Sequence, residues 1–127
     1  MRPPHSTEQP QERAYVRIKS SRPVLVYSAR DRNQVQSFTV DVSGGGLLLA
    51  GPDTLRIGEQ VTFRLTLTPG VLPISGTGSV VRSDTHGRRA IEFDTISDLD
   101  RRRLVRFILE CQHAEAQSAL DTDGEQR

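Results

Sequence analysis

The chain has 127 residues, of which 35% are hydrophobic and 26% are charged, and its formal net charge is +1 at pH 7. This length suits one domain with a single core, and the composition is that of a soluble globular protein, which excludes disordered and fibrous classes. The near-neutral charge, the low aromatic content and the absence of Trp argue against a nucleic-acid binder that neutralises phosphates or stacks bases.

Several further classes are disfavoured by the residues that the sequence lacks. The single cysteine, Cys111, excludes an internal disulfide, and the three His and one Cys show no metal-ligand spacing. No histidine lies in a context that suggests a nucleophile with a base and an orienting partner, so we expect neither an enzyme nor a metal site. The sequence shows no signal peptide and no run of about 20 apolar residues. We therefore expect a cytoplasmic protein without membrane insertion.

The N-terminal segment is polar and then basic. Residues 1–12 contain three prolines and predict a flexible arm. The segment 13–17 follows, with Arg13 and Arg17 four residues apart and Tyr15 between them. In a helix the two guanidinium groups would share a face, and in a flexible arm they would be free to converge on one ligand. The alternative is a solvated basic segment that precedes the first strand.

Short alternating segments separated by Gly and Pro turns occupy the middle of the chain. The pattern predicts strands, at 23–28, 35–42, 46–50, 60–67, 75–84 and 88–93. The alternation is clearest in the fourth, where we expect one buried face made by Val61, Phe63, Leu65 and Leu67. Strands without intervening helices favour an antiparallel barrel or sandwich, and a closed barrel would also remove exposed edges.

The hydrophobic period changes after residue 96 and predicts one C-terminal helix. Ser97 is a suitable N-cap, and Asp98 and Asp100 favour the positive end of a helix that we expect from about 98 to 115. The run 101–103 consists of three arginines and is interpreted as a solvated face. We expect a folded domain over 13–115 and a flexible tail over 116–127.

The stretch 41–46, Asp-Val-Ser-Gly-Gly-Gly, interrupts the alternation between the second and third strands. Glycines accept positive φ and allow another molecule to approach the backbone. Asp41 supplies an acceptor and Ser43 a hydroxyl that donates and accepts. Considered alone, this stretch is most simply a tight β-turn.

Taken together, the two motifs are more specific than either is alone. Arg-x-x-x-Arg at Arg13 and Arg17, followed by Asp-x-Ser-x-x-Gly at Asp41, Ser43 and Gly46, resembles the PilZ domain family. The resemblance covers about residues 11 to 112. It implies a mainly β fold, a six-stranded antiparallel β-barrel with a C-terminal α-helix, which binds the bacterial second messenger cyclic di-GMP.

The chemistry of that ligand matches the residues of both motifs. Two phosphates and two guanines require forked cationic donors and an acceptor for the base edge, and the resemblance assigns the cationic role to Arg13 and Arg17. Asp41 would accept from guanine N–H groups, Ser43 would bond the ligand or fix the turn, and Gly46 would give the backbone its shape. Binding would order the arm and relay the signal to an unidentified downstream protein.

One departure and one rival interpretation accompany this expectation. Glu12 stands where many family members carry a further Arg, and its carboxylate should repel an anionic ligand. Arg22 and Arg88 or Arg89 are possible additional contacts that no motif supports. The rival is a protein-interaction module with the same barrel that works without nucleotide, using the helix or the 101–103 face.

Overall fold

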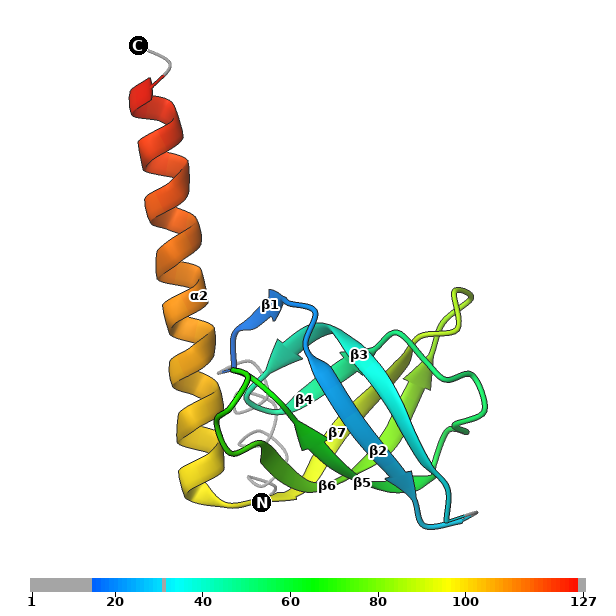
Figure 1. Cartoon of the computed structure of the whole chain (residues 1–127). Coiled ribbons are helices and arrows are strands. Elements are labelled where there is room, and N and C mark those ends of the chain that lie inside the picture. Colours follow the sequence, from blue (N-terminus) through cyan, green and yellow to red (C-terminus); the bar gives the residue numbers. More distant parts are fainter. Residues whose placement is uncertain (1–14, 31, 126–127) are drawn as a thin grey trace, which may run out of the picture.

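The computed structural model describes residues 15–30 and 32–125, and they form seven strands and one helix (Figure 1). The elements follow one another as β1 (Arg17–Lys19), β2 (Pro23–Ser28), β3 (Gln34–Ser43), β4 (Gly46–Leu49), β5 (Gln60–Leu65), β6 (Ile74–Ser83), β7 (Arg89–Ile96) and α2 (Asp98–Glu125). The six strands predicted from the alternation are β2 to β7, and each is present within a few residues of its expected bounds.

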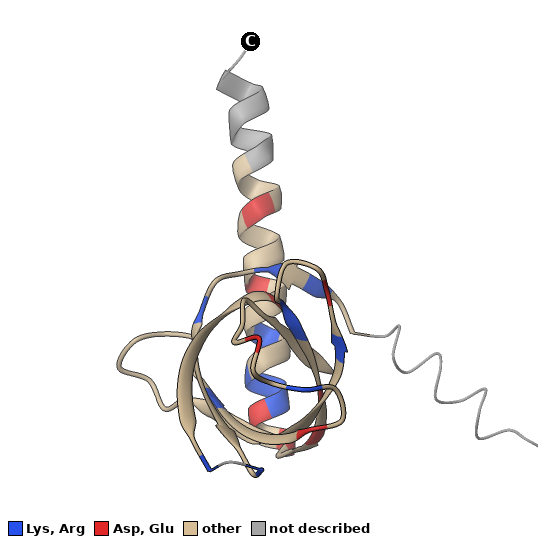
Figure 2. Cartoon of the chain, turned by 90° about the vertical axis from the view of Figure 1, so that its right-hand side faces the viewer, with Lys and Arg blue, Asp and Glu red and all other residues tan. Residues whose placement is uncertain are grey.

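All strand pairings are antiparallel, and six of the strands close a ring. The order β3-β2-β5-β6-β7-β4 is completed by a pairing between β4 and β3. The predicted six-stranded antiparallel β-barrel with a C-terminal helix is thus confirmed. Figure 2 looks into the barrel and shows the closed ring with α2 behind it.

The strand β1 lies outside this ring and was not predicted as a strand. The first half of β3 pairs with β2, while its second half pairs with β1 through Arg17–Ser43, Ile18–Val42 and Lys19–Asp41. Its burial alternates, with Ile18 buried between two exposed residues. The segment therefore adopts a strand at Arg17, and the helical alternative is wrong there. Arg13 and the proposed arm, residues 1–12, lie outside the described residues.

The core is made by inward-facing residues of the barrel and by one face of α2. The predicted buried face is confirmed, because all four of its residues are buried: Val61, Phe63 and Leu65 in β5, and Leu67 just after it. Phe63 stacks on Phe93, with ring centroids 4.9 Å apart. From α2, Leu104 and Ile108 join the same core. The helix thus packs across one open end of the barrel, near β1, β3 and β6 (Figure 2).

The helix begins where the sequence predicts and ends later. The backbone amide of Asp100 donates to the Ser97 hydroxyl over 3.0 Å, so Ser97 is the N-cap. The helix then continues to Glu125, whereas the sequence predicts an end near 115. All side chains from Gln112 to Ser118 are exposed, and this part of α2 projects beyond the barrel (Figure 1). The predicted helix end was wrong because a hydrophobic stripe in the sequence marks only the part of a helix that packs against the core.

Across residues 15–30 and 32–125, no set of three His, Cys, Asp or Glu side chains groups closely enough to hold a metal ion. Among the described helices, none combines the length and the apolar character required to cross a membrane.

Candidate functional site

The pairing of β1 with β3 brings the two sequence motifs together. Arg17 stands directly opposite Ser43, and Lys19 stands opposite Asp41. Opposed residues of an antiparallel pair share a face, and alternate residues of a strand share it too. Because Ile18 and Val42 point into the core, Arg17, Asp41 and Ser43 lie on the outer face. The register therefore places a cation, a carboxylate and a hydroxyl side by side.

Ser43 holds the turn that joins β3 to β4. Its hydroxyl oxygen accepts from the backbone amides of Gly45 and Gly46, each over 3.1 Å, and it donates to the carbonyl oxygen of Gly46 over 3.3 Å. Sequence reasoning left open whether Ser43 bonds a ligand or fixes the turn. In this structure its bonds are those of a residue that fixes the turn.

This turn needs glycines because neighbouring atoms lie too close for a side chain, and not because its backbone has positive φ. The described glycines with positive φ are Gly58, Gly70 and Gly87, so the 44–46 turn does not use the positive φ that glycine allows. A Cβ on Gly46 would overlap the backbone carbonyl oxygen of Ile91 in β7. A Cβ on Gly44 would overlap the ring of Tyr15. Any side chain at either position would displace a neighbour of the site.

Tyr15 connects this turn to α2. Its ring packs against Gly44 and Gly45, and its hydroxyl accepts a hydrogen bond from Nη1 of Arg101 over 3.0 Å. The centre of the Arg101 guanidinium lies 5.4 Å from the centroid of the same ring, within the range of a cation–π contact. The residue between the two motif arginines thus joins the barrel turn to the helix.

A cleft of about 700 Å³ opens over these residues. Four of the five predicted site residues line it: Arg17, Asp41, Ser43 and Gly46. The fifth, Arg13, lies outside the described residues. Further lining side chains come from the segment before β1 and from β6, β7 and α2, and they include Tyr15, Arg82, Glu92, Phe93 and Arg101. Three arginines on the walls suit an anionic ligand, and the two carboxylates supply acceptors for N–H donors.

The two charged motif residues that line the cleft, Arg17 and Asp41, form no ion pair with each other or with other described residues. Within residues 15–30 and 32–125 the ion pairs are Arg30–Glu59, Arg88–Asp84 and Arg103–Asp100. Neither Arg17 nor Asp41 takes part in one. No ion pair within these residues therefore competes with a bound molecule for either side chain.

The additional arginines suggested by sequence have other partners. The Arg22 guanidinium lies 5.0 Å from the ring centroid of Phe107, Arg88 pairs with Asp84 over 2.7 Å, and Arg89 donates to the carbonyl oxygens of Asp53 and Leu55, each over 2.6 Å. None of them lines the cleft. These arginines stabilise loops and the helix packing.

The site residues that sequence reasoning missed are Tyr15, Arg82, Glu92 and Arg101. They come from four separate elements or segments, so no spacing along the chain relates them. Arg101 belongs to the run that was interpreted as a solvated face. In the structure only Arg102 of that run is exposed, whereas Arg101 and Arg103 are half-buried.

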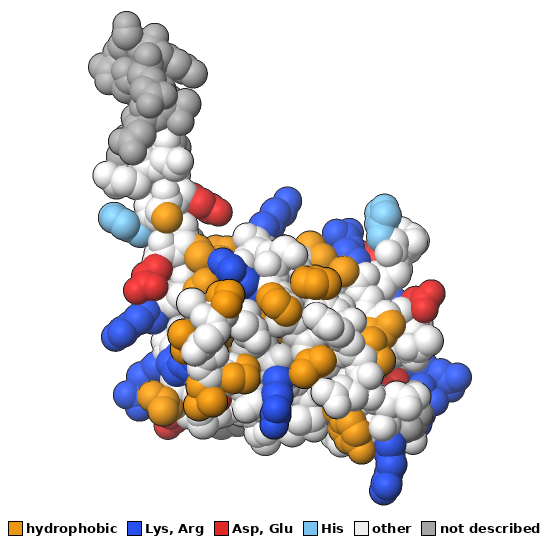
Figure 3. Space-filling model, viewed as in Figure 1, with side chains coloured by type: hydrophobic (Ala, Val, Ile, Leu, Met, Phe, Trp, Pro, Cys, Tyr) orange, Lys and Arg blue, Asp and Glu red, His pale blue; other side chains and the backbone are white. Residues whose placement is uncertain are grey.

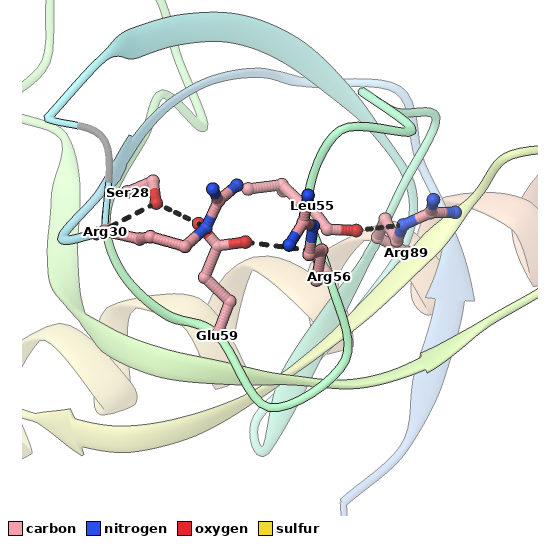
Figure 4. Close-up of polar contacts among 6 residues, drawn as sticks. All are labelled: Ser28, Arg30, Leu55, Arg56, Glu59 and Arg89. Atoms are coloured by element: carbon pink, nitrogen blue, oxygen red, sulfur yellow. Dashed lines mark hydrogen bonds and ion pairs between the residues drawn. The ribbon is translucent and has the colours of Figure 1, made fainter.

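A second polar cluster surrounds Glu59 (Figure 4), and none of its residues lines the cleft. The buried carboxylate accepts from the Ser28 hydroxyl and from the Arg56 backbone amide, and it pairs with Arg30 over 3.5 Å. Burial raises the pKa of Glu59, but the two hydrogen bonds and the Arg30 charge lower it by more, so the net pKa lies below the ordinary 4.5. All of these partners belong to the protein, so this cluster is structural.

Comparison with known proteins gives one family and several similar structures. The family model described as "PilZ domain" matches residues 11–110. The PilZ domain of CeSA from a cellulose-synthesizing bacterium is 30% identical with a TM-score of 0.56, over 75% of this chain and 98% of that one. A search of curated proteins finds no match.

Two further solved structures share the fold at lower identity. The Bacillus subtilis inhibitor of motility, MotI/DgrA, is 20% identical with a TM-score of 0.68 over 79% of this chain, and this chain spans only 51% of that protein. The PilZ domain of YcgR from Escherichia coli, solved with c-di-GMP, is 19% identical with a TM-score of 0.59, over 84% of this chain and 95% of that one.

Proposed function

The chain belongs to the PilZ domain family, and from this premise we propose that it is a receptor for cyclic di-GMP. The proposed ligand site consists of Arg13, Arg17, Asp41, Ser43 and Gly46. The protein would bind the second messenger without transforming it, and it would pass the signal to a downstream protein. The similar YcgR domain was solved with this ligand, which supports the choice of ligand.

The observation that carries the proposal is the register of β1 on β3. It sets Arg17 of the first motif opposite Ser43 of the second, and it leaves Arg17 and Asp41 facing one cleft. Two motifs that are distant in sequence and adjacent in space, on a surface with a cationic wall, support one shared ligand.

The chemistry assigns a different task to each residue. The planar guanidinium of Arg17 would donate two parallel hydrogen bonds to phosphate oxygens, or to O6 and N7 of guanine. The Asp41 carboxylate accepts only, so it would receive N–H groups of a guanine edge. Ser43 and Gly46 would act through the backbone, because together they hold the turn that borders the cleft.

The relay would depend on the segment before Tyr15. If Arg13 grips the same ligand as Arg17, the chain on either side of Tyr15 must come to the cleft when the ligand binds. The arm at residues 1–12 would then change its conformation with occupancy, and a partner that recognises one conformation would read the signal.

Titration calorimetry of the full chain with cyclic di-GMP tests this function. We expect saturable heat with the wild-type chain and none with GTP. Arg17→Ala should weaken binding by about 10- to 100-fold, because one bidentate contact contributes about 1–3 kcal/mol. Arg64→Ala is the matched control, since it removes the same charge from an exposed position of β5 outside the cleft.

Folded protein that gives no heat with cyclic di-GMP would refute the proposal. Equal losses of affinity in Arg17→Ala and Arg64→Ala would also contradict it. They would indicate that any positive charge on the protein attracts the anionic ligand, without a specific site. Circular dichroism of each variant confirms that the barrel remains folded before its affinity is interpreted.

A second candidate is a protein-interaction module that works without nucleotide. The outer side of β2 and β3 exposes Leu25, Tyr27 and Phe38, by 36%, 40% and 47%, and Figure 3 shows apolar side chains on that face of the barrel. A hollow of about 740 Å³ also follows the outer side of α2 past Val105 and Leu109. Partner binding that is unaffected by cyclic di-GMP and by Arg17→Ala would favour this candidate.

A further inference from the structure

Arg101 reaches the cleft from α2, although it belongs to neither sequence motif. It lines the same cleft as Arg17 and Asp41. Its Nη1 donates to the neutral hydroxyl of Tyr15, and its guanidinium lies against the Tyr15 ring. The fork of this arginine is therefore held at the site by a tyrosine that itself lies between the two motif arginines in sequence.

Arg101 has a hydrogen-bond donor without a partner, in contrast to Arg103 on the same helix. The Nε atom is buried and has no hydrogen-bond partner among the described residues. By contrast, Arg103 pairs with Asp100 over 3.1 Å and also donates to the carbonyl oxygen of Leu72. A buried donor without a partner costs free energy. Packing of α2 alone therefore does not explain the placement of Arg101.

The helix dipole does not explain the placement of Arg101 either. The residue lies close to the N-terminus of α2, which begins at Asp98. The helix dipole favours anions at this end and disfavours cations. Within the described residues Arg101 takes part in no ion pair that would offset this effect. A cation held here near an anion site is better explained by a ligand.

We propose that Arg101 is a further ligand-binding residue, which α2 contributes to the cyclic di-GMP site. On binding, its guanidinium would exchange the Tyr15 hydroxyl for two oxygens of a ligand phosphate. A charge-assisted, bidentate contact is stronger than one bond to a neutral hydroxyl, so the exchange favours the bound state. The inference rests on the proposed function and adds the helix to the site.

Calorimetry with cyclic di-GMP tests this on Arg101→Ala, with Arg102→Ala as the matched control. Arg102 is the next residue of the same helix, carries the same charge and is exposed. We expect Arg101→Ala to weaken binding by about tenfold or more, as for loss of a hydrogen-bonded charge pair, and Arg102→Ala to change it by less than about twofold. Arg101→Lys should restore only part of the affinity, because an ammonium group lacks the fork.

Tyr15→Phe tests the exchange step separately. It keeps the ring against Gly44 and removes the hydroxyl that holds Arg101. Since Arg101 would be released from its neutral partner, affinity should stay equal or rise. An affinity loss as large as that of Arg101→Ala would overturn the exchange, because it would mean that the hydroxyl itself binds the ligand.

Failure of the inference is distinguishable from failure of the proposed function. If wild-type protein binds cyclic di-GMP and folded Arg101→Ala binds it equally well, Arg101 is not a ligand-binding residue, although the receptor function stands. If Arg101→Ala does not fold, the comparison of Arg101→Lys with wild type decides, and equal affinity would overturn the forked contact. If wild type does not bind, the proposed function itself fails.

Discussion

At the residue scale, Glu59 is a carboxylate that is buried and fully bonded. Its two oxygens accept hydrogen bonds from the Ser28 hydroxyl and the Arg56 amide, and they form an ion pair with the Arg30 guanidinium. These bonds connect the end of β2 with the loop before β5. A buried charge with such partners is costly to alter, because its removal leaves the partners without an acceptor.

We expect Glu59→Gln to lower the free energy of unfolding at pH 7 by about 1–3 kcal/mol, because the amide replaces one charged acceptor. The difference from wild type should depend on pH. A folded pKa below 4.5 means that this stability is present above pH 4.5 and is lost as the pH falls through the folded pKa. Urea unfolding of both proteins between pH 7 and pH 3 measures the difference. A difference that stays constant over this range would contradict the prediction.

Single residues of the site differ in how well the sequence predicts them. Asp41, Ser43 and Gly46 belong to a motif with fixed spacing, and the structure brings them to one turn and its strand. Arg101 was unpredictable, because successive residues of a helix point about 100° apart. Three adjacent arginines therefore meet three environments, and only the packing of α2 decides which one faces the cleft.

At the element scale, the strands of the ring were predictable because they alternate over several residues. β2 and β5 show strict exposed–buried alternation over six residues each. β1 has three residues and one buried side chain, Ile18, which is too short a pattern to distinguish from a loop. The missed strand is the one that sets the register of the site.

The approach of β4 to β7 gives a prediction about Gly46. Its backbone lies so close to Ile91 that a Cβ would overlap a carbonyl oxygen, which cannot rotate away. Gly46→Ala should therefore separate the two strands and lower the free energy of unfolding by about 1–3 kcal/mol.

Gly51→Ala is the control for Gly46→Ala. A Cβ at Gly51 would meet its nearest neighbour, the backbone amide of Asp53, at an ordinary 3.8 Å. Denaturant unfolding compares the two variants with wild type. Equal stability of Gly46→Ala and wild type would show that the barrel absorbs the added methyl group without strain.

At the scale of the whole molecule, α2 consists of a packed half and a projecting half. Leu104 and Ile108 are buried in the core, and Cys111 packs against it. The side chains from Gln112 to Ser118 are exposed. Only the first half can contribute much to stability, because isolated helical turns are marginal in water.

A chain that ends at Ala114 should therefore retain the stability of the full chain to within about 0.5 kcal/mol. Ile108→Ala in the full chain should instead cost about 2–5 kcal/mol, since it leaves a cavity in the core. Urea unfolding of the three proteins measures both effects. A large loss in the shortened chain would reveal that the projecting half stabilises the fold.

The position of β1 outside the closed ring bears on how long a ligand stays bound. Opening β1 breaks its pairing with β3 and leaves every pairing of the ring intact, so this opening requires less free energy than global unfolding. Arg17 leaves the cleft with the strand, while Asp41 and Ser43 remain on the ring. We expect β1 amides to exchange their hydrogens faster than those of the ring, and the buried side chain of Ile18 to set the residence time of the second messenger.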